Sequence, residues 1–166
     1  TYTGLPEALM SGVSPQPVKS PEVLLVNRSF AKSLDLNFSK VEDSFLAQIF
    51  SGNSLCNSSK TIAQAYAGHQ FGFFTNLGDG RAVLIGEQIS KSGNRFDVQL
   101  KGSGHTPYSR GGDGRAALGP VIREYVVSEA MHHLGIPTTR SLAVIKTGEM
   151  VLRLSLIHIS EPTRRY

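Results

Sequence analysis

The stretch RFDVQLKGSG, residues 95–104, decides the fold class of this chain. Phe96, Val98 and Leu100 alternate with polar residues, and this period of two places the three apolar side chains on one face of a β-strand. Lys101 ends the alternation and is followed by a glycine-rich segment. The pattern predicts a half-buried strand over 95–101, with a lysine at its end and a flexible loop beyond it.

The residues before this strand predict two more strands. Segments 71–77 and 82–85 are apolar and β-prone, and the turn sequence Gly78-Asp79-Gly80 separates them. A second turn sequence, residues 91–94, separates 82–85 from the strand over 95–101. We therefore expect residues 71–101 to form a three-stranded antiparallel meander.

A long helix is expected after the glycine-rich loop, from about Pro120 to Leu134. Proline is favoured in the first turn of a helix, while Gly135 and Pro137 are typical of the end of one. Segments 141–146 and 150–152 predict two further strands. Because strands and helices do not alternate along the chain, we expect an α+β fold with an antiparallel sheet and no doubly wound sheet.

The first sixty residues are interpreted as short helices and loops. Asn27 can cap a helix that runs to Leu34, a second helix is expected over 42–50, and a third over 61–67. The expected organisation is an N-terminal helical and loop segment (1–60), a sheet with one long helix (61–153), and a tail foreign to the domain (154–166).

Composition limits the possible functions. The 166 residues, 40% hydrophobic and 18% charged, suit one globular domain, and the chain has no run of about 18 apolar residues to cross a membrane. The single cysteine, Cys56, excludes a disulfide framework, and the five histidines show no metal-ligand spacing. The net charge of +4 favours a phosphate-bearing partner but is too small for a polycationic nucleic-acid tail.

Two charged residues are candidates for chemistry. Glu124 falls within an apolar stripe at helical spacing, so we expect a buried carboxylate that needs a cation. Lys101 is the nearest such cation upstream, and a strand lysine paired with a helix glutamate is how protein kinases grip phosphates. The alternatives are a solvated Lys101, and a Glu124 that faces water or pairs with Arg123 or Arg140.

The sequence Gly-Asp-Gly-Arg-Ala occurs twice, at 78–82 and at 112–116. Small residues, free N–H groups and an arginine suit a phosphate, and the second copy lies just before the expected helix N-terminus. The alternatives are plain turns, or a basic Gly/Arg surface around residues 109–112 that binds RNA and weakens with salt.

Four stretches together resemble one family: YAGHQFG (66–72), LGDGRA (77–82), QLKGSGHTPYSRGGDGRAAL (99–118) and IREYVVSEAMHHLGIPTTR (122–140). They resemble the selenoprotein O family of protein adenylyltransferases. The resemblance implies a protein-kinase-like fold, with residues 61–153 as the N-lobe. It also implies that ATP binds inverted relative to kinases, so that AMP passes to a Ser, Thr or Tyr hydroxyl of a protein.

The resemblance also implies roles for particular residues. Lys101 and Glu124 match the catalytic ion pair of the family. The positions that match its nucleotide-contacting residues are Gly78, Gly80, Arg81, Lys101, Asp113 and Gly114. No metal ligand is expected among the residues of this chain.

The partners implied by the resemblance are ATP, with Mg²⁺ or Mn²⁺ in the full-length protein, and protein substrates with hydroxyl side chains. The family's catalytic aspartate and metal ligands are expected beyond Arg153, so we expect this chain alone to be inactive. Membrane and nucleic acid are not expected partners. The expected location is cytoplasmic in a bacterium or mitochondrial in a eukaryote. The alternatives are a pseudokinase module that only binds nucleotide and the RNA-binding module.

Overall fold

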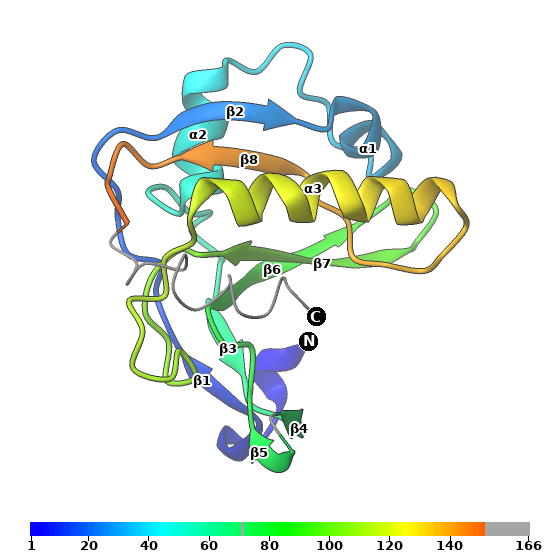
Figure 1. The fold of residues 1–166 in the computed structure, drawn as a ribbon. Coiled ribbons are helices and arrows are strands. Elements are labelled where there is room, and N and C mark those ends of the chain that lie inside the picture. The colour runs from blue at the N-terminus through cyan, green and yellow to red at the C-terminus, as the bar shows by residue number, and fades with distance from the viewer. Residues whose placement is uncertain (71, 152–166) are drawn as a thin grey trace, which may run out of the picture.

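The computed structural model describes residues 1–70 and 72–151, and its architecture is α+β with antiparallel sheets, as predicted (Figure 1). The main sheet has four strands in the order β1 (Met10–Gly12), β3 (Ile62–Gln64), β6 (Ala82–Ile89) and β7 (Arg95–Lys101). Two further pairs are β2 (Glu22–Val26) with β8 (Ala143–Lys146), and β4 (Ala67–Gln70) with β5 (Phe73–Asn76). The helices are α1 (Arg28–Ser33), α2 (Asp43–Ser51) and α3 (Leu118–His133), and two 3₁₀ turns, Tyr2–Gly4 and Glu7–Leu9, precede β1.

The hairpin of β6 and β7 confirms the strand predicted over 95–101. Residues of β7 alternate between exposed and more buried positions, and Leu100 is in the core together with Val83 and Leu84 of β6. The pairing runs from Ile89 opposite Arg95 to Ala82 opposite Lys101. Lys101 therefore lies beside the first residue of β6, directly after the turn at 78–81.

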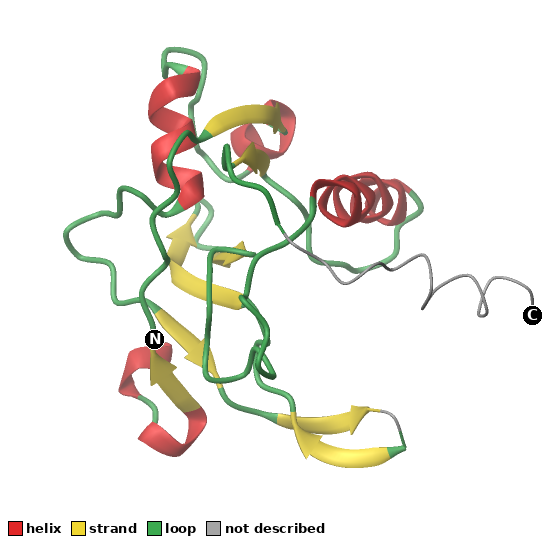
Figure 2. Ribbon diagram, turned by 60° about the vertical axis from the view of Figure 1, so that its left-hand side comes forward, coloured by secondary structure: helices red, strands yellow, loops and turns green. Residues whose placement is uncertain are grey.

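The three-stranded meander predicted over 71–101 is wrong in its first strand. β5 pairs with β4, not with β6, and Gly72 in the turn between them has a φ of +82°. The β4–β5 ribbon lies at the opposite end of the molecule from the β2–β8 pair in Figures 1 and 2. A β-prone run shows that a strand forms but not which neighbour it pairs with. β5 pairs with β4, which precedes it in sequence, and β6 is paired with β3 and β7.

The helix predicted over 61–67 is also wrong, because this segment contains β3. Ile62 pairs with Gly12 of β1 on one side and with Leu84 of β6 on the other, and Ile62 and Ala63 are buried. A short apolar run has no clear period, so pairing on both edges overrides its local preference. The sequence prediction missed β1 and β2, through which the first sixty residues pair with strands of the segment 61–153.

The two helices predicted in the first sixty residues are confirmed. The Asn27 side chain accepts a hydrogen bond of 3.0 Å from the Phe30 N–H at the start of α1, and α2 ends at Gly52. Buried apolar residues of this part of the chain form an apolar layer in which α2 packs against β2 and β8. This layer contains Ala31, Leu34, Leu46, Ala47 and Val144.

The long helix α3 confirms the helix predicted at 120–134, but none of its residues is buried. Apolar residues lie on more than one side of it, and it crosses between the β2–β8 pair and the β6–β7 hairpin without covering either (Figure 1). Within residues 1–70 and 72–151, no helix is both long and apolar enough to span a membrane. Met150 and Val151 are not in a strand, and the tail expected over 154–166 lies outside the described residues.

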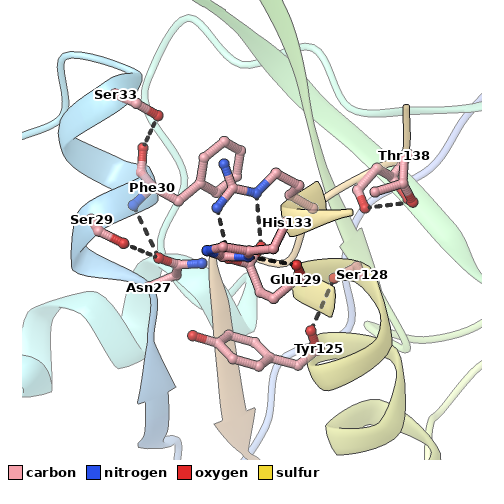
Figure 3. A network of polar contacts seen from close by, with 11 residues as sticks. Asn27, Ser29, Phe30, Ser33, Tyr125, Ser128, Glu129, His133 and Thr138 are labelled. Carbon is pink, nitrogen blue, oxygen red and sulfur yellow. Dashed lines mark hydrogen bonds and ion pairs between the residues drawn. The ribbon is translucent and has the colours of Figure 1, made fainter. Parts of the chain in front are cut away.

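A polar clamp fastens the C-terminal half of α3 to α1. Arg140 donates from Nε and Nη2 to the two carboxylate oxygens of Glu129, at 2.8 and 2.6 Å, and its guanidinium lies 4.0 Å from the centre of the Phe30 ring. Figure 3 shows Glu129 facing Asn27 and Phe30 across the gap between the helices. Because both charged side chains are over four-fifths buried, this clamp sets where α3 lies.

We expect Glu129→Gln to lower the free energy of unfolding at neutral pH by about 1–3 kcal/mol, because it weakens a charge-assisted bidentate contact. The hydrogen bonds from Arg140 hold the pKa of Glu129 below its ordinary value of 4.5. A depressed folded-state pKa gives stability that is present above pH 4.5 and is lost as the pH falls through the folded pKa. Urea unfolding from about pH 6 to pH 3 should therefore show the two proteins converging in acid, and a constant difference would contradict the assignment.

Candidate functional site

The ion pair predicted from the sequence is present. Lys101 at the end of β7 donates to Glu124 on α3, with 2.9 Å between Nζ and Oε2. Strand pairing fixes the backbone at Lys101, and the clamp at Glu129 lies just over one turn of helix beyond Glu124. The ion pair therefore joins the main sheet to α3, and the position of each partner is fixed by its own element.

The expectation that Glu124 is buried in an apolar stripe is wrong. Its side chain is 47% exposed and that of Lys101 is 53% exposed. The reason is that none of the residues of α3 is buried, and Glu124 and Glu129 in its interior make polar contacts with Lys101 and Arg140. A half-exposed ion pair contributes little to stability.

A cleft of about 660 Å³ opens beside Lys101, between the turn at 78–81 and the loop at 108–115. All the positions that match nucleotide-contacting residues of the resembled family lie on its lining: Gly78, Gly80, Arg81, Lys101, Asp113 and Gly114. Segments that are far apart in sequence thus contribute to one surface. Tyr66 and Tyr108 add aromatic surface to the same cleft.

The turn at 78–81 is anchored to β3 and is not the tip of the predicted hairpin. Gly78 N–H donates to Tyr66 O and Asp79 N–H donates to Gln64 O, both at 2.9 Å. The Asp79 carboxylate accepts the Gln64 N–H at 2.8 Å, and burial raises the pKa of Asp79 above its ordinary value. Asp79 thus serves to hold the turn on β3.

The loop at 112–115 closes onto the strand end that carries Lys101. Asp113 accepts the Arg115 N–H at 2.9 Å, and Arg81 reaches across to donate to Arg115 O at 3.0 Å. The Arg115 side chain donates to two backbone carbonyls of the N-terminal segment and lies 3.7 Å from a Glu149 carboxylate oxygen. Because Arg115 is largely buried in these contacts, it serves to hold the loop more than to form a basic surface.

Three residues that the sequence analysis did not single out hold the two glycine segments together. Thr106 and Ser109 both donate to Gly80 O, and the Tyr108 ring lies against Gly78 while its hydroxyl meets Ser11 Oγ at 3.0 Å. All three belong to the motif HTPYSR between the glycines of this loop. A run of hydroxyl residues inside a glycine-rich loop is the feature that could have indicated them.

The charge of the cleft suits a polyanion. Four basic side chains and two acidic ones line it, and the basic ones are Arg81, Lys101, Arg110 and Arg115. Both acids accept backbone N–H groups, from Gln64 and from Arg115. In the described part of the chain, no group of three or more His, Cys, Asp or Glu residues could hold a metal ion. The described residues thus suit phosphate but do not form a metal site.

A strand lysine in contact with a helix carboxylate, beside a cationic cleft between two glycine turns, resembles the arrangement with which protein kinases hold phosphates. The chain belongs to the family described as protein adenylyltransferase SelO, whose sequence model matches residues 1–160.

Individual relatives agree with this assignment. The chain is 61% identical over 153 residues to the protein nucleotidyltransferase YdiU of Pelagibacter ubique. The aligned region covers 92% of the chain and 32% of the relative. It is 60% identical over 153 residues to YdiU of Geobacillus kaustophilus, with the same coverage, and 56% identical over 164 residues to YdiU of Nitrosococcus oceani, with 99% and 33% covered. The chain thus spans about a third of the length of these curated relatives.

Proposed function

We propose that this chain forms the ATP-binding, kinase-N-lobe-like part of a protein adenylyltransferase. The observation that carries the proposal is the 2.9 Å contact of Lys101 with Glu124 at the edge of the cleft between the glycine turns. Glu124 orients the ammonium, and Lys101 grips the phosphates of ATP. Gly78, Gly80 and Arg81 contact the nucleotide from one side and Asp113 and Gly114 from the other.

The reaction moves AMP onto a protein. The oxygen of a Ser, Thr or Tyr hydroxyl attacks the α-phosphorus and loses its proton. The bond from that phosphorus to the oxygen that bridges the α- and β-phosphates breaks, and pyrophosphate leaves. Negative charge develops on the phosphate oxygens, and an ammonium already held in place stabilises it without reorganisation. Holding the nucleotide in a fixed position in the cleft supplies much of the remaining rate enhancement.

A divalent cation, Mg²⁺ or Mn²⁺, is the expected companion of ATP in such a reaction, where it neutralises phosphate charge. The described residues do not fit such an ion, because they contain no group of three or more His, Cys, Asp or Glu side chains that could hold it. The residues of this chain are therefore assigned to the phosphates alone.

Labelled ATP tests the proposal. The full-length protein that carries this sequence, incubated with Mg²⁺ and a protein mixture, should transfer label from the α-phosphate of ATP to protein. Label from the γ-phosphate should stay in solution because it leaves with pyrophosphate. Transfer of γ-label alone would show an ordinary kinase, and ATP binding without transfer of either label would show a pseudokinase.

A further inference from the structure

Thr106 is fully buried, with 0% of its surface exposed, and it lies behind the cleft without being part of its lining. Its hydroxyl donates to Gly80 O and accepts the Tyr108 N–H at 3.1 Å. Its own N–H donates to Ser109 Oγ at 2.8 Å, and Ser109 Oγ meets the same Gly80 carbonyl at 3.3 Å. Two hydroxyls of one loop thus fix a single carbonyl of the other loop.

The fixed carbonyl determines the direction of the next amide. The peptide bond between Gly80 and Arg81 is trans, so its C=O and N–H point in opposite directions. With the carbonyl directed at Thr106, the Arg81 N–H points away from Thr106. Gly80 and Arg81 both line the cleft. Within the described residues, the Arg81 N–H has no hydrogen-bond acceptor. Outward N–H groups in a glycine turn are phosphate donors.

We propose that Thr106 is a positioning residue of the nucleotide site, which holds the Gly80 carbonyl so that the Arg81 amide N–H is presented to a phosphate of ATP. The inference rests on the proposed function and extends it to a residue that never touches the nucleotide. It also names the Arg81 main chain as a ligand donor in addition to the side chain. The Gly80 position allows this geometry because its φ is +62°.

The test compares Thr106→Val with Thr106→Ser in the full-length protein. Valine keeps the shape of threonine and removes the hydroxyl, whereas serine keeps the hydroxyl. We expect Thr106→Val to weaken binding of ATP, and of a non-hydrolysable ATP analogue in calorimetry, about tenfold. The KM for ATP should rise to match, with kcat within about twofold, because the lost hold affects binding of ground and transition states alike. In Thr106→Ser, the affinity for ATP and the KM for ATP should stay at their wild-type values.

Amide hydrogen exchange without nucleotide gives a readout that does not depend on ATP. In Thr106→Val, the amides of Gly78, Asp79 and Ala82 should exchange faster than in the wild type, because these amides hold the turn. Thr75→Val is the matched control, since Thr75 lies exposed on β5 and outside the cleft lining. The control should leave both affinity and exchange unchanged.

The outcomes separate this inference from the proposed function. A wild-type protein that binds no ATP would refute the proposed function, and with it the use of the Arg81 amide. A wild type that binds ATP while a folded Thr106→Val binds it equally well would overturn the inference alone. If Thr106→Val does not fold, Thr106→Ala is measured in the same way. Should both fail to fold while Thr106→Ser folds, Thr106 serves stability only and the inference is overturned.

Discussion

Replacing Lys101 by alanine in the full-length protein is expected to lower the rate of nucleotidyl transfer at least about 100-fold. The ammonium is held 2.9 Å from Glu124 at the edge of the cleft, and alanine removes the charge that would meet the phosphates. Transfer of α-labelled ATP to protein measures the loss. Stability should change by less than about 1 kcal/mol, because both side chains are about half exposed.

Lys91→Ala is the control for this experiment, since Lys91 is an exposed lysine in the turn between β6 and β7. It removes the same charge from the protein at a place remote from the cleft lining, so transfer should be unaffected. A folded Lys101→Ala protein with wild-type transfer would refute the role given to Lys101. Loss of transfer in both variants would point to net charge instead of the ion pair.

Gly114→Ala is expected to destabilise the protein by about 3–5 kcal/mol, the largest effect on folding that we predict. A Cβ at this position would lie 1.8 Å from the Gly104 carbonyl oxygen and 2.1 Å from its carbon. Backbone cannot rotate away as a side chain can, and the φ of +68° adds the strain of a left-handed alanine. The two loop segments would separate, so ATP binding should also fall. Chemical denaturation measures the first effect and calorimetry the second.

Gly111→Ala provides the comparison within the same loop. Gly111 has a similar φ of +73°, but nothing lies within 4 Å of the position of its Cβ. This variant should cost only the backbone strain, about 1–2 kcal/mol. Equal destabilisation by the two variants would show that positive φ alone matters and that the close approach of Gly104 and Gly114 does not.

The elements with complete local patterns could be predicted from the sequence. The alternation of Phe96, Val98 and Leu100 predicted β7, and Asn27 predicted the start of α1. Gly135 marked the end of α3, because a left-handed residue after the last turn is a local requirement. In each case the residues that define the element lie within a few positions of one another.

The strand partners could not be predicted in this way. β5 was expected to pair with β6, yet β6 lies between β3 and β7. The segment 61–67 was expected to be a helix, yet Ile62 is paired on both sides. Pairing depends on competition between segments distant in sequence, and a local pattern contains no information about which competitor has the lower free energy.

The candidate site, too, could be predicted only in part from the sequence. Lys101, Glu124 and the glycine turns were named from residue types and from the family motifs. The fold places Lys101 and both glycine turns on one cleft and brings Glu124 into contact with Lys101. The exposure of Glu124 was expected only as an alternative to burial, because it depends on how α3 is held by Arg140 and not on the helix itself. Thr106 was missed because its neighbour, Gly80, is 26 residues away in sequence.

The amino-acid sequence by itself determined the antiparallel α+β class, the strand that ends in Lys101, the presence of the long helix α3 and membership of the family. Each of these depends on periodicity, capping residues or ordered motifs, which are properties of contiguous residues. Only the tertiary structure decided which strands pair, how far Glu124 is exposed and how Thr106 joins the two glycine segments. Those features arise from contacts between residues far apart in the chain, whose free energies become comparable only when the whole fold is assembled.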